Sequence, residues 1–430
     1  SAGHSVSSLQ AVPFHSRVAN AALAYARYLF KSFWPQDLAV FYSYPKHFPI
    51  GWVLAAVILL VAVSAWFVLR TKRHPYLIVG WLWFMGTLVP TLGLVQVGSQ
   101  SMADRYMYIP SVGLFVLLVW GLNALLDHWP CKRQALAGVG TVALACCLAC
   151  TWFQLGYWQN SEGLFRHAIE VTTDNYLAYD ALGTVLNDQG KHDEALAYYS
   201  RSVRIESKDV EGQYDLGTLP IQQRRFEEAV QSFTAALRCN PSFAQAQINL
   251  GKALLEQGKL VQAAAHFSEA ARLIPDDPEA HYNLGTVRLM QAKPEQAVAC
   301  FLEALRITPD YRDAHANLGV ALMRQGRPVE GVTHLAAALR LNPDNPQAHC
   351  NLGLALLELN RPGEAAVHFT VALRLNPQAP GPHYHLALAL VRQDKVQQAR
   401  AHARTARDLA TAAGQAALAA KAEELLKQQR

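Results

Sequence analysis

The chain has 430 residues, of which 51% are hydrophobic and only 17% charged, so it can bury a sizeable core and is not intrinsically disordered. Lys and Arg number 38 against 33 Asp and Glu, a net charge of +5 that is dispersed along the chain and too small to predict a nucleic-acid-binding surface. Long apolar runs fall almost entirely before residue 156, which predicts a membrane-embedded first half and a water-exposed second half.

The segment before residue 49 predicts an amphipathic helix followed by an interfacial loop. The polar side chains share one narrow arc of the helix: Arg17, Asn20, Arg27 and Lys31. The apolar side chains cover the rest: Val18, Ala22, Leu23, Leu29, Phe30 and Phe33. We expect this helix to lie on the membrane surface, or to pack against helices missing from this chain, and to end at Trp34-Pro35. Residues 1–48 are predicted to be non-cytoplasmic.

Four apolar runs within residues 49–155 predict four membrane-spanning helices, since each supplies the about 20 apolar residues that a crossing needs. They cover residues 51–69, 76–97, 109–126 and 135–153. Gly86, Pro90 and Gly93 interrupt the second run, so we expect a kinked helix there.

Basic residues in the short connections predict the orientation of this bundle. Arg70, Lys72 and Arg73 follow the first run, and Lys132 and Arg133 precede the fourth. The excess of positive charge in cytoplasmic loops places residues 70–75 and 127–134 inside the cell. The loop 98–108 and everything after residue 155 then face outward, and we expect an integral protein of the bacterial inner membrane with a periplasmic C-terminal half.

The C-terminal half repeats with a strict period. A Leu-Gly or Leu-Ala pair recurs at residues 182, 216, 250, 284, 318, 352 and 386, followed by a small residue, a large apolar residue such as Phe267 or Phe301, an alanine and usually a proline. This pattern and its spacing resemble the tetratricopeptide repeat (TPR), in which small residues let two antiparallel helices approach closely. We expect a TPR solenoid over residues 156–430: a half repeat at 158–175, seven repeats at 176–413 and a capping helix that is continuous after Thr405.

The expected fold is therefore all-α, a polytopic bundle of about four spans followed by a TPR superhelix. Pro220 falls inside the first helix of the second repeat, where it predicts a kink or a lost turn.

Polar residues also recur at one position of the first helix of the repeats, directly before the Leu of each pair: Asp215, Asn249, Asn283, Asn317 and Asn351. In TPR superhelices this position faces the concave groove. An asparagine amide both donates and accepts, so a row of them can bind the main chain of an extended peptide. The row is similar to the asparagine ladder of the O-linked N-acetylglucosamine transferase superhelix. The alternative is that each amide only satisfies a neighbouring helix.

A second row consists of His281, His315, His349 and His383. Neighbouring packed helices lie about 8–10 Å apart, whereas zinc requires nitrogens at about 2.1 Å. We therefore interpret these histidines as packing residues and predict no metal site.

The chain contains no Walker loop, dinucleotide fingerprint, HExxH or G-x-S-x-G motif. One polar cluster remains, Asp104, Arg105, Tyr106 and Tyr108, at the outer end of the third run. An arginine there can bind a lipid-linked phosphate through its planar fork of donors, with tyrosines flanking it at the depth of the lipid headgroups. The alternative is an ordinary membrane-interface anchor with a local Asp–Arg pair.

Residues 101–113, Ser-Met-Ala-Asp-Arg-Tyr-Met-Tyr-Ile-Pro-Ser-Val-Gly, are followed by two apolar runs, Trp158 and the repeats. This arrangement resembles the transmembrane-and-TPR O-mannosyltransferase-like proteins and their bacterial relatives. The resemblance implies a GT-C-type glycosyltransferase that moves a sugar from a polyprenyl-phosphate donor to Ser or Thr of an exported protein presented by the repeats. Membrane lipid and an extended acceptor peptide are the implied partners.

GT-C enzymes carry an acidic catalytic motif in their first non-cytoplasmic loop, and neither Asp37 nor Asp104 matches it. We therefore expect the C-terminal part of such an enzyme, with its catalytic residues upstream of this chain, that binds its ligands without catalysing transfer. The competing hypothesis is a non-enzymatic, membrane-anchored TPR scaffold for envelope or secretion-complex assembly.

Overall fold

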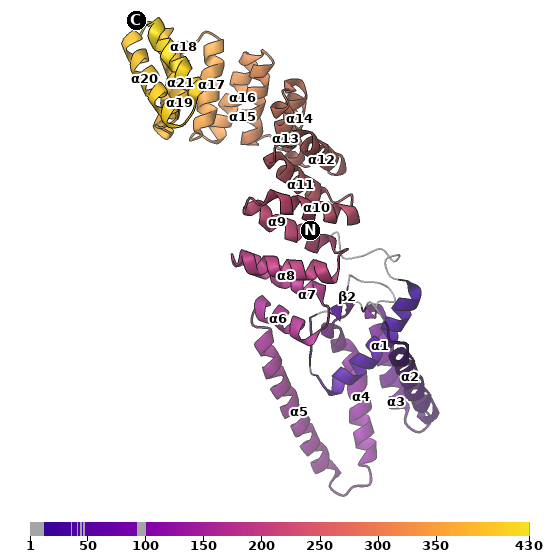
Figure 1. The fold of residues 1–430 in the computed structure, drawn as a ribbon. Helices are drawn as coiled ribbons and strands as arrows, with labels where there is room; N and C mark the ends of the chain where they lie inside the picture. The colour runs from indigo at the N-terminus through magenta and orange to yellow at the C-terminus, as the bar shows by residue number, and fades with distance from the viewer. Residues whose placement is uncertain are drawn as a thin grey trace. The chain divides into compact units, whose positions relative to one another are not determined.

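A computed structural model describes residues 13–35, 37–40, 42–43, 45, 48–92 and 100–429 (Figure 1). Within these residues the regular structure is helical, apart from two very short strands that pair with each other. The chain forms two compact units, residues 1–219 and 220–430, and the division between them falls inside helix α9.

The first unit contains the apolar helices and the beginning of the repeats. Its elements are α1 (Phe14–Phe33), β1 (Tyr42–Ser43), α2 (Ile50–Arg70), α3 (Pro75–Leu88), the 3₁₀ turn η1 (Val89–Thr91), β2 (Gln100–Met102), the 3₁₀ turn η2 (Asp104–Met107), α4 (Tyr108–Leu125), α5 (Lys132–Tyr157), α6 (Ser161–Val171), α7 (Tyr176–Asp188), α8 (His192–Ile205) and α9 (Val210–Gln222).

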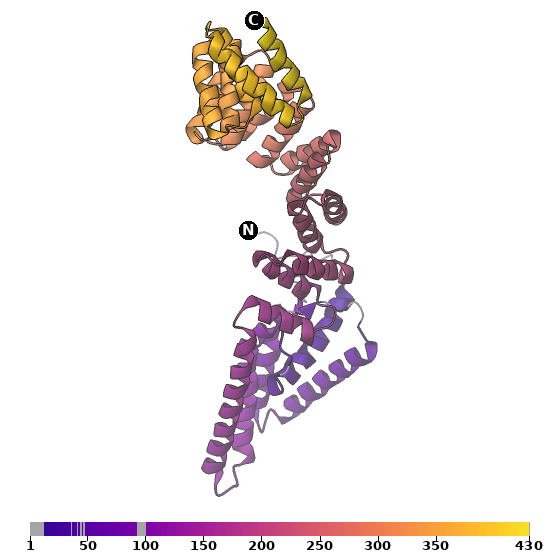
Figure 2. The ribbon, with the colours of Figure 1, turned by 60° about the vertical axis from the view of Figure 1, so that its left-hand side comes forward.

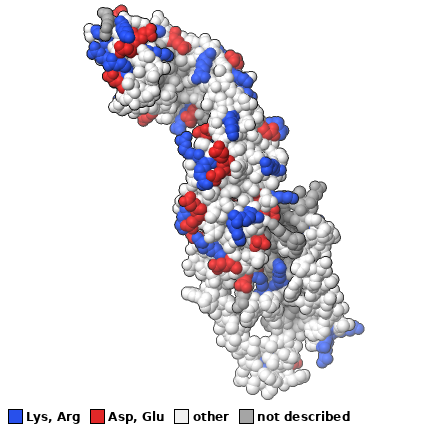
Figure 3. Space-filling view, in the orientation of Figure 1, with Lys and Arg blue, Asp and Glu red and all other residues white. Residues whose placement is uncertain are grey.

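Three helices in the described part of the chain, α2, α4 and α5, are long and apolar enough to cross a membrane. The described part of the second predicted run, 76–97, forms α3, which ends at Leu88, and the 3₁₀ turn η1 around Pro90, where proline interrupts the regular helix. The end of that run lies outside the described residues. No residue of α5 is buried, and α2 buries only Ala56 and Leu60. On the visible face, charged side chains gather over the repeats and are sparse over the apolar helices (Figure 3).

Helix α1 packs against the apolar helices of its own chain. It buries a face of small and tyrosine side chains, including Tyr25 and Tyr28, whereas Phe30 and Phe33 are exposed. The Tyr25 hydroxyl donates to the carbonyl of Met85 at 2.5 Å, and the Tyr28 hydroxyl donates to that of Ala103 at 2.9 Å. These two hydroxyls satisfy one backbone carbonyl in α3 and one just before η2. The amphipathic pattern therefore correctly predicted a helix, but it did not predict which face of the helix is buried.

Backbone contact between two glycines joins α3 to α4. A Cβ atom built at Gly80 would lie 2.5 Å from the carbonyl oxygen of Gly113, and one built at Gly113 would lie 2.3 Å from that of Gly80. Such close approach is available only to residues without a side chain. The core beside it contains Trp81, Phe84 and Leu114.

Helix pairs that follow the repeat period make up the second unit (Figure 2). They are α10 (Phe226–Cys239), α11 (Ala244–Glu256), α12 (Leu260–Leu273), α13 (Pro278–Met290), α14 (Pro294–Ile307), α15 (Arg312–Arg324), α16 (Pro328–Leu341), α17 (Pro346–Glu358), α18 (Pro362–Leu375), α19 (Pro380–Val391), α20 (Val396–Ala412) and α21 (Ala416–Gln428). The chain thus contains a TPR domain; we call the first helix of each repeat helix A and the second helix B.

A glycine of helix A packs against a large side chain of helix B in the repeats that contain Gly183, Gly251, Gly285, Gly319 and Gly353. A Cβ atom at Gly285 would lie 2.7 Å from the fully buried ring of Phe301, and one at Gly251 would lie equally close to that of Phe267. The last repeat has Ala387 and Ala403 instead, and Leu425 and Leu426 of α21 complete its core. The capping helix therefore supplies apolar volume that a helix B ring supplies elsewhere.

The turn between helix A and helix B requires a left-handed residue in every repeat. Backbone φ is positive at the equivalent position of successive repeats: Gly190, Arg224, Gly258, Ala292, Gly326, Asn360 and Asp394. Glycine adopts this conformation without strain, whereas a side chain such as that of Ala292 disfavours it.

Two further expectations about the repeats are corrected. Helix α9 runs through Pro220 to Gln222 and keeps the 13 residues of α7 and α11, so no turn is lost. The C-terminal helix is not continuous after Thr405, because α20 ends at Ala412 and α21 begins at Ala416 after a turn with Gly414 at φ +69°.

Candidate functional site

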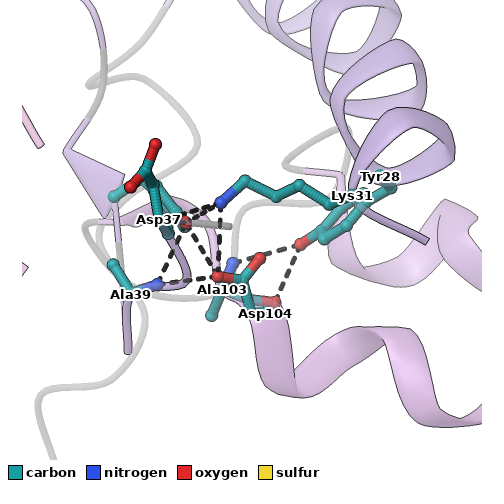
Figure 4. A network of polar contacts seen from close by, with 7 residues as sticks. Tyr28, Lys31, Asp37, Ala39, Ala103 and Asp104 are labelled. Atoms are coloured by element: carbon teal, nitrogen blue, oxygen red, sulfur yellow. Dashed lines mark hydrogen bonds and ion pairs between the residues drawn. The ribbon is translucent and has the colours of Figure 1, made fainter. Parts of the chain in front are cut away.

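Asp104, the first residue of η2, is the centre of a polar network close to the start of α4 (Figure 4). Its Oδ2 atom accepts a hydrogen bond of 2.7 Å from the backbone N–H of Ala39 and another of 2.7 Å from the Tyr42 hydroxyl. The Lys31 ammonium, near the end of α1, lies 3.7 Å from the same oxygen. One carboxylate therefore joins η2 to the end of α1 and to the loop that follows α1, which both lie far from it in the sequence.

Lys31 has oxygen and aromatic neighbours of its own. Its Nζ donates to the carbonyl oxygen of Asp37 and to the hydroxyl oxygen of Tyr42, both at 2.6 Å. The ammonium also lies 5.0 Å from the centre of the Tyr42 ring, within the range of a cation–π contact.

Both charges of this pair are largely withdrawn from solvent, with side chains 15% exposed for Lys31 and 16% for Asp104. Burial raises the pKa of Asp104, although the Lys31 charge and the bonds from Tyr42 and Ala39 oppose that rise. Burial also lowers the pKa of Lys31, against the attraction of Asp104. Desolvation thus disfavours both ions, and each needs the other to remain charged.

The network lies at the polar end of a cleft of about 570 Å³ between the end of α1, α4 and α5. The walls are mostly apolar, with Leu114, Phe115 and Leu118 from α4 and Leu155 from α5. Two polar atoms at the cleft are buried without a hydrogen-bond partner among the described residues, Oδ1 of Asp104 and Oε1 of Gln154. A narrow apolar space with a charged end suits a ligand that has a polar head and an apolar chain.

The structure brings together only part of the predicted phosphate cluster. Asp104 and the exposed Tyr108 line the cleft, whereas Tyr106 is half-buried in η2 and is not among the lining residues. The backbone of Arg105 belongs to η2, but its side chain lies outside the described residues. The partner of Asp104 is Lys31, which the sequence placed on the polar arc of α1 without indicating what it would meet.

The predicted asparagine row occupies equivalent, half-buried positions of successive A helices in the second unit. Asn317 donates from Nδ2 to the Tyr282 hydroxyl at 3.2 Å, and Asn351 accepts from Gln347 at 3.1 Å. The Nδ2 atom of Asn283 is buried and has no hydrogen-bond partner among the described residues. The amide groups of this row therefore differ in how many of their hydrogen bonds are made within the protein.

Asp215, the first member of the predicted row, belongs to an acidic cluster in the first unit instead. Burial and then the neighbouring acids raise the pKa of Asp180 to about 8 and that of Asp215 to about 6, and burial also raises the pKa of Asp209. Asp180 is therefore mostly protonated at neutral pH. The cluster carries less negative charge than three ordinary aspartates, and nothing in the sequence pattern indicated it.

Comparison with known families agrees with the repeat architecture. Residues 168–375 match the family described as the cilia and flagella-associated protein 70 C-terminal domain, and residues 380–405 match a tetratricopeptide repeat family.

Curated relatives are protein O-mannosyl-transferases. The chain is 36% identical to mouse (Mus musculus) TMTC4 over 97 residues, 23% of this chain and 13% of that protein. It is 26% identical to human (Homo sapiens) TMTC1 over 158 residues, 35% of this chain and 17% of that protein, and 26% identical to Drosophila melanogaster Tmtc3 over 129 residues, 30% and 14%. The similarity lies in the repeats, and the matched segments span less than a fifth of each of these relatives.

Solved structures with a similar course of the chain are TPR proteins. The crystal structure of YrrB, titled a TPR protein with an unusual peptide-binding site, is 23% identical with a TM-score of 0.40 and covers 43% of this chain and 95% of its own. A tetratricopeptide repeat protein from Parabacteroides merdae is 15% identical with a TM-score of 0.46 and covers 60% and 99%.

Proposed function

We propose that this chain is a membrane-anchored TPR protein whose repeats bind extended segments of exported proteins. The observation that carries the proposal is the row of half-buried amides on successive A helices, with the Nδ2 of Asn283 buried and unpartnered among the described residues. A buried donor without an acceptor is costly, so a peptide carbonyl that reaches it is favoured. Main-chain recognition of this kind tolerates many side-chain sequences.

The membrane anchor is supported by the apolar surface of α2, α4 and α5. Their exposed residues include Leu69, Val142 and Trp152, and a lipid environment removes such side chains from water. Ala39 of the N-terminal loop shares a small core with Ala168 of α6 and Ala178 of α7. This contact supports one common side, which we take to be the periplasm, for the N-terminal loop and the first repeat.

The cleft beside Asp104 is proposed to hold a lipid-linked phosphate, the head of a polyprenyl-phosphate-sugar donor. Lys31 supplies a cation at the cleft, with Arg105, Tyr106 and Tyr108 on the adjoining η2 and α4. The similarity to protein O-mannosyl-transferases supports a GT-C-type O-glycosylation role in which the repeats present the acceptor. This similarity is confined to the repeats. We assign no catalytic base for sugar transfer among the described residues.

A non-enzymatic scaffold for envelope or secretion-complex assembly is the second candidate. It is favoured by the long match of residues 168–375 to the C-terminal domain of a cilia and flagella-associated protein. A scaffold has no need of a lipid donor, so binding of polyprenyl phosphate at the cleft separates the two functions.

Replacing Asn283, Asn317 and Asn351 together by alanine is expected to weaken peptide binding at least about tenfold. Each lost amide removes a hydrogen bond worth about 0.5–1.5 kcal/mol to the peptide main chain. The measurement is fluorescence anisotropy of a labelled, unstructured Ser/Thr-rich peptide with the detergent-solubilised chain.

The matched control replaces Thr333, Thr370 and Thr405, which are exposed on B helices and bond only to their own helix. Their alanine variant should bind the peptide as the native chain does. Equal affinity of the asparagine variant and this control, with both folded by circular dichroism, would retire the amide row as a peptide site.

The orientation can be tested with two native cysteines that are both exposed, Cys131 between α4 and α5 and Cys239 at the end of α10. In chains that keep only one of them, a membrane-impermeant maleimide added to intact spheroplasts should label Cys239 and leave Cys131 unmodified. Cys131 should react after permeabilisation. The reverse pattern would place the repeats in the cytoplasm and exclude exported proteins as ligands.

A further inference from the structure

Pairs of histidines join helix A to helix B in three consecutive repeats of the second unit. In each pair the two Nδ1 atoms lie 3.0–3.1 Å apart: His315–His334, His349–His368 and His383–His402. The helix A members belong to the histidine row that the sequence pattern predicted to be packing residues, and the pattern did not indicate the helix B partners. The structure pairs each with a residue of its own repeat.

The geometry of these pairs is that of a hydrogen bond. In the first two pairs the ring centres are 5.3 Å apart and the two nitrogens 3.0 Å apart, so the rings point nitrogen to nitrogen nearly in line. Two nitrogens on one tetrahedral zinc ion would be about 3.4 Å apart, and their lone pairs would meet at an angle rather than in line. Each pair therefore shares a proton, N–H···N.

The position of that proton follows from the other ring nitrogen of the helix A histidine. Nε2 of His315 lies 2.9 Å from the carbonyl oxygen of Pro309, and His349 and His383 make the same contact with Pro343 and Pro377. A carbonyl can only accept, so this Nε2 carries a hydrogen and Nδ1 of the neutral ring is an acceptor. The helix B histidine is then the donor of the N–H···N bond.

An earlier repeat performs the same connection without a second imidazole. Gln247 of α11 donates from Nε2 to the carbonyl of Pro241 at 3.1 Å, and its Oε1 lies 2.7 Å from Nδ1 of His266 in α12. An amide oxygen can only accept, so His266 is the donor there. Gln247 therefore makes both bonds of a helix A histidine but cannot be protonated.

Protonation affects the histidine pairs and the Gln247–His266 pair differently. The first extra proton on a histidine pair goes to Nε2 of the helix B ring and leaves the N–H···N bond in place. A second must go to Nδ1 of the helix A ring, where two N–H groups would then face each other at 3.0 Å. The folded pair thus holds one extra proton, whereas two histidines in an unfolded chain hold two.

The surroundings oppose charging of the helix B rings. Burial, and then the paired helix A histidine, lowers the pKa of His334, His368 and His402. Glu330 acts in the opposite direction on His334, and Glu364 does so on His368. These acids pair at 2.7 Å with Arg327 and Arg361. No acid among the described residues opposes the lowered pKa of His402.

We propose that the three histidine pairs form acid-sensitive clasps, which close α15 on α16, α17 on α18 and α19 on α20 at neutral pH and release them in acid. The direction of the effect is fixed by proton uptake. The open state binds more protons than the closed one, so closure is fully present above the ordinary imidazole pKa of about 6.5 and is lost as the pH falls below it.

The test is hydrogen exchange of the full chain in detergent at about pH 7.5 and about pH 5.5, values that bracket the ordinary imidazole pKa. After correction for intrinsic exchange rates, amides of α15–α20 should lose protection at least about tenfold more than those of α11 and α12. The reason is that the open pair binds one more proton than the closed pair, and one such proton changes the opening equilibrium about tenfold per pH unit. Burial also lowers the pKa of His266, so α11 and α12 carry the response of one buried imidazole without a second one, and this makes them the internal control.

The decisive variant replaces His315, His349 and His383 by glutamine, copying Gln247. It should fold at neutral pH and show the same small acid response in α15–α20 as in α11 and α12. If it does not fold, glutamine at His334, His368 and His402 also leaves one imidazole per pair and should respond equally little. An unchanged acid response in a folded variant, no response in the native chain, or protection of the native α15–α20 by added zinc chloride at neutral pH would overturn the proposal.

Discussion

Replacing Phe301 by alanine is expected to lower the free energy of unfolding of its repeat by about 3–5 kcal/mol, the range found for deleting a buried ring. The ring is fully buried and fills the space left by Gly285, so its loss opens a cavity between α13 and α14 that neither backbone can close. Urea unfolding followed by far-ultraviolet circular dichroism measures the change.

The chain supplies the control for this substitution, because Leu335 occupies the same place opposite Gly319 in the next repeat. Phe301→Leu should therefore cost clearly less than Phe301→Ala, in keeping with the tolerance of cores for a smaller change of apolar volume. Equal costs for the two variants would mean that the ring does not fill the gap at Gly285.

Replacing Asp104 by asparagine is expected to destabilise the first unit by about 3–5 kcal/mol, because it leaves the Lys31 ammonium buried without its counter-ion. The amide oxygen can still accept from Ala39 and Tyr42, so the effect reports the charge. All nine tryptophans lie before residue 159, and thermal unfolding followed by tryptophan fluorescence therefore reads out this unit.

The double variant Asp104→Asn with Lys31→Met should recover at least half of that loss, since no unpaired charge remains. Asp127→Asn, which breaks an exposed pair with Lys132, should leave the transition unchanged. If the double variant is less stable than Asp104→Asn, the two residues do not form a coupled pair.

The same double variant separates folding from ligand binding. It retains the apolar cleft but lacks the Lys31 cation, so a polyprenyl phosphate in detergent should bind at least about tenfold more weakly than to the native chain. Unchanged binding in a folded double variant would remove Lys31 from the proposed donor site and strengthen the scaffold alternative.

The regular period of the repeats was sufficient to predict the TPR helices, because each repeat carries its own small and large residues and contacts mainly its neighbours. Local rules were less reliable where packing decides. Pro220 was expected to kink the helix or remove a turn, and α9 keeps its full length, so no turn is lost. The left-handed turn is occupied by glycine, the residue type that adopts it without strain, at Gly190, Gly258 and Gly326, whereas Ala292 adopts it without any such residue-type signal.

The candidate sites divide in the same way. A row such as Asn283, Asn317 and Asn351 is a matter of spacing and can be read directly from the chain. The partners of Asp104 and of the helix A histidines cannot be read from the chain in this way. Lys31 is distant from Asp104 in the sequence, and the helix B histidines form a separate row whose contact with the helix A row depends on how the two helices pack.

By itself the sequence determined the helical repeats, the apolar character of the first half and the row of amides, because all three depend on residue type at fixed local spacing. Only the tertiary structure decided that α1 turns its tyrosines inward, that a buried Lys31–Asp104 pair ends an apolar cleft, and that histidines meet nitrogen to nitrogen. Those arrangements depend on which desolvated polar groups find partners across the fold. Both histidine rows follow the repeat period in the chain, but the period alone does not say that the two rows meet.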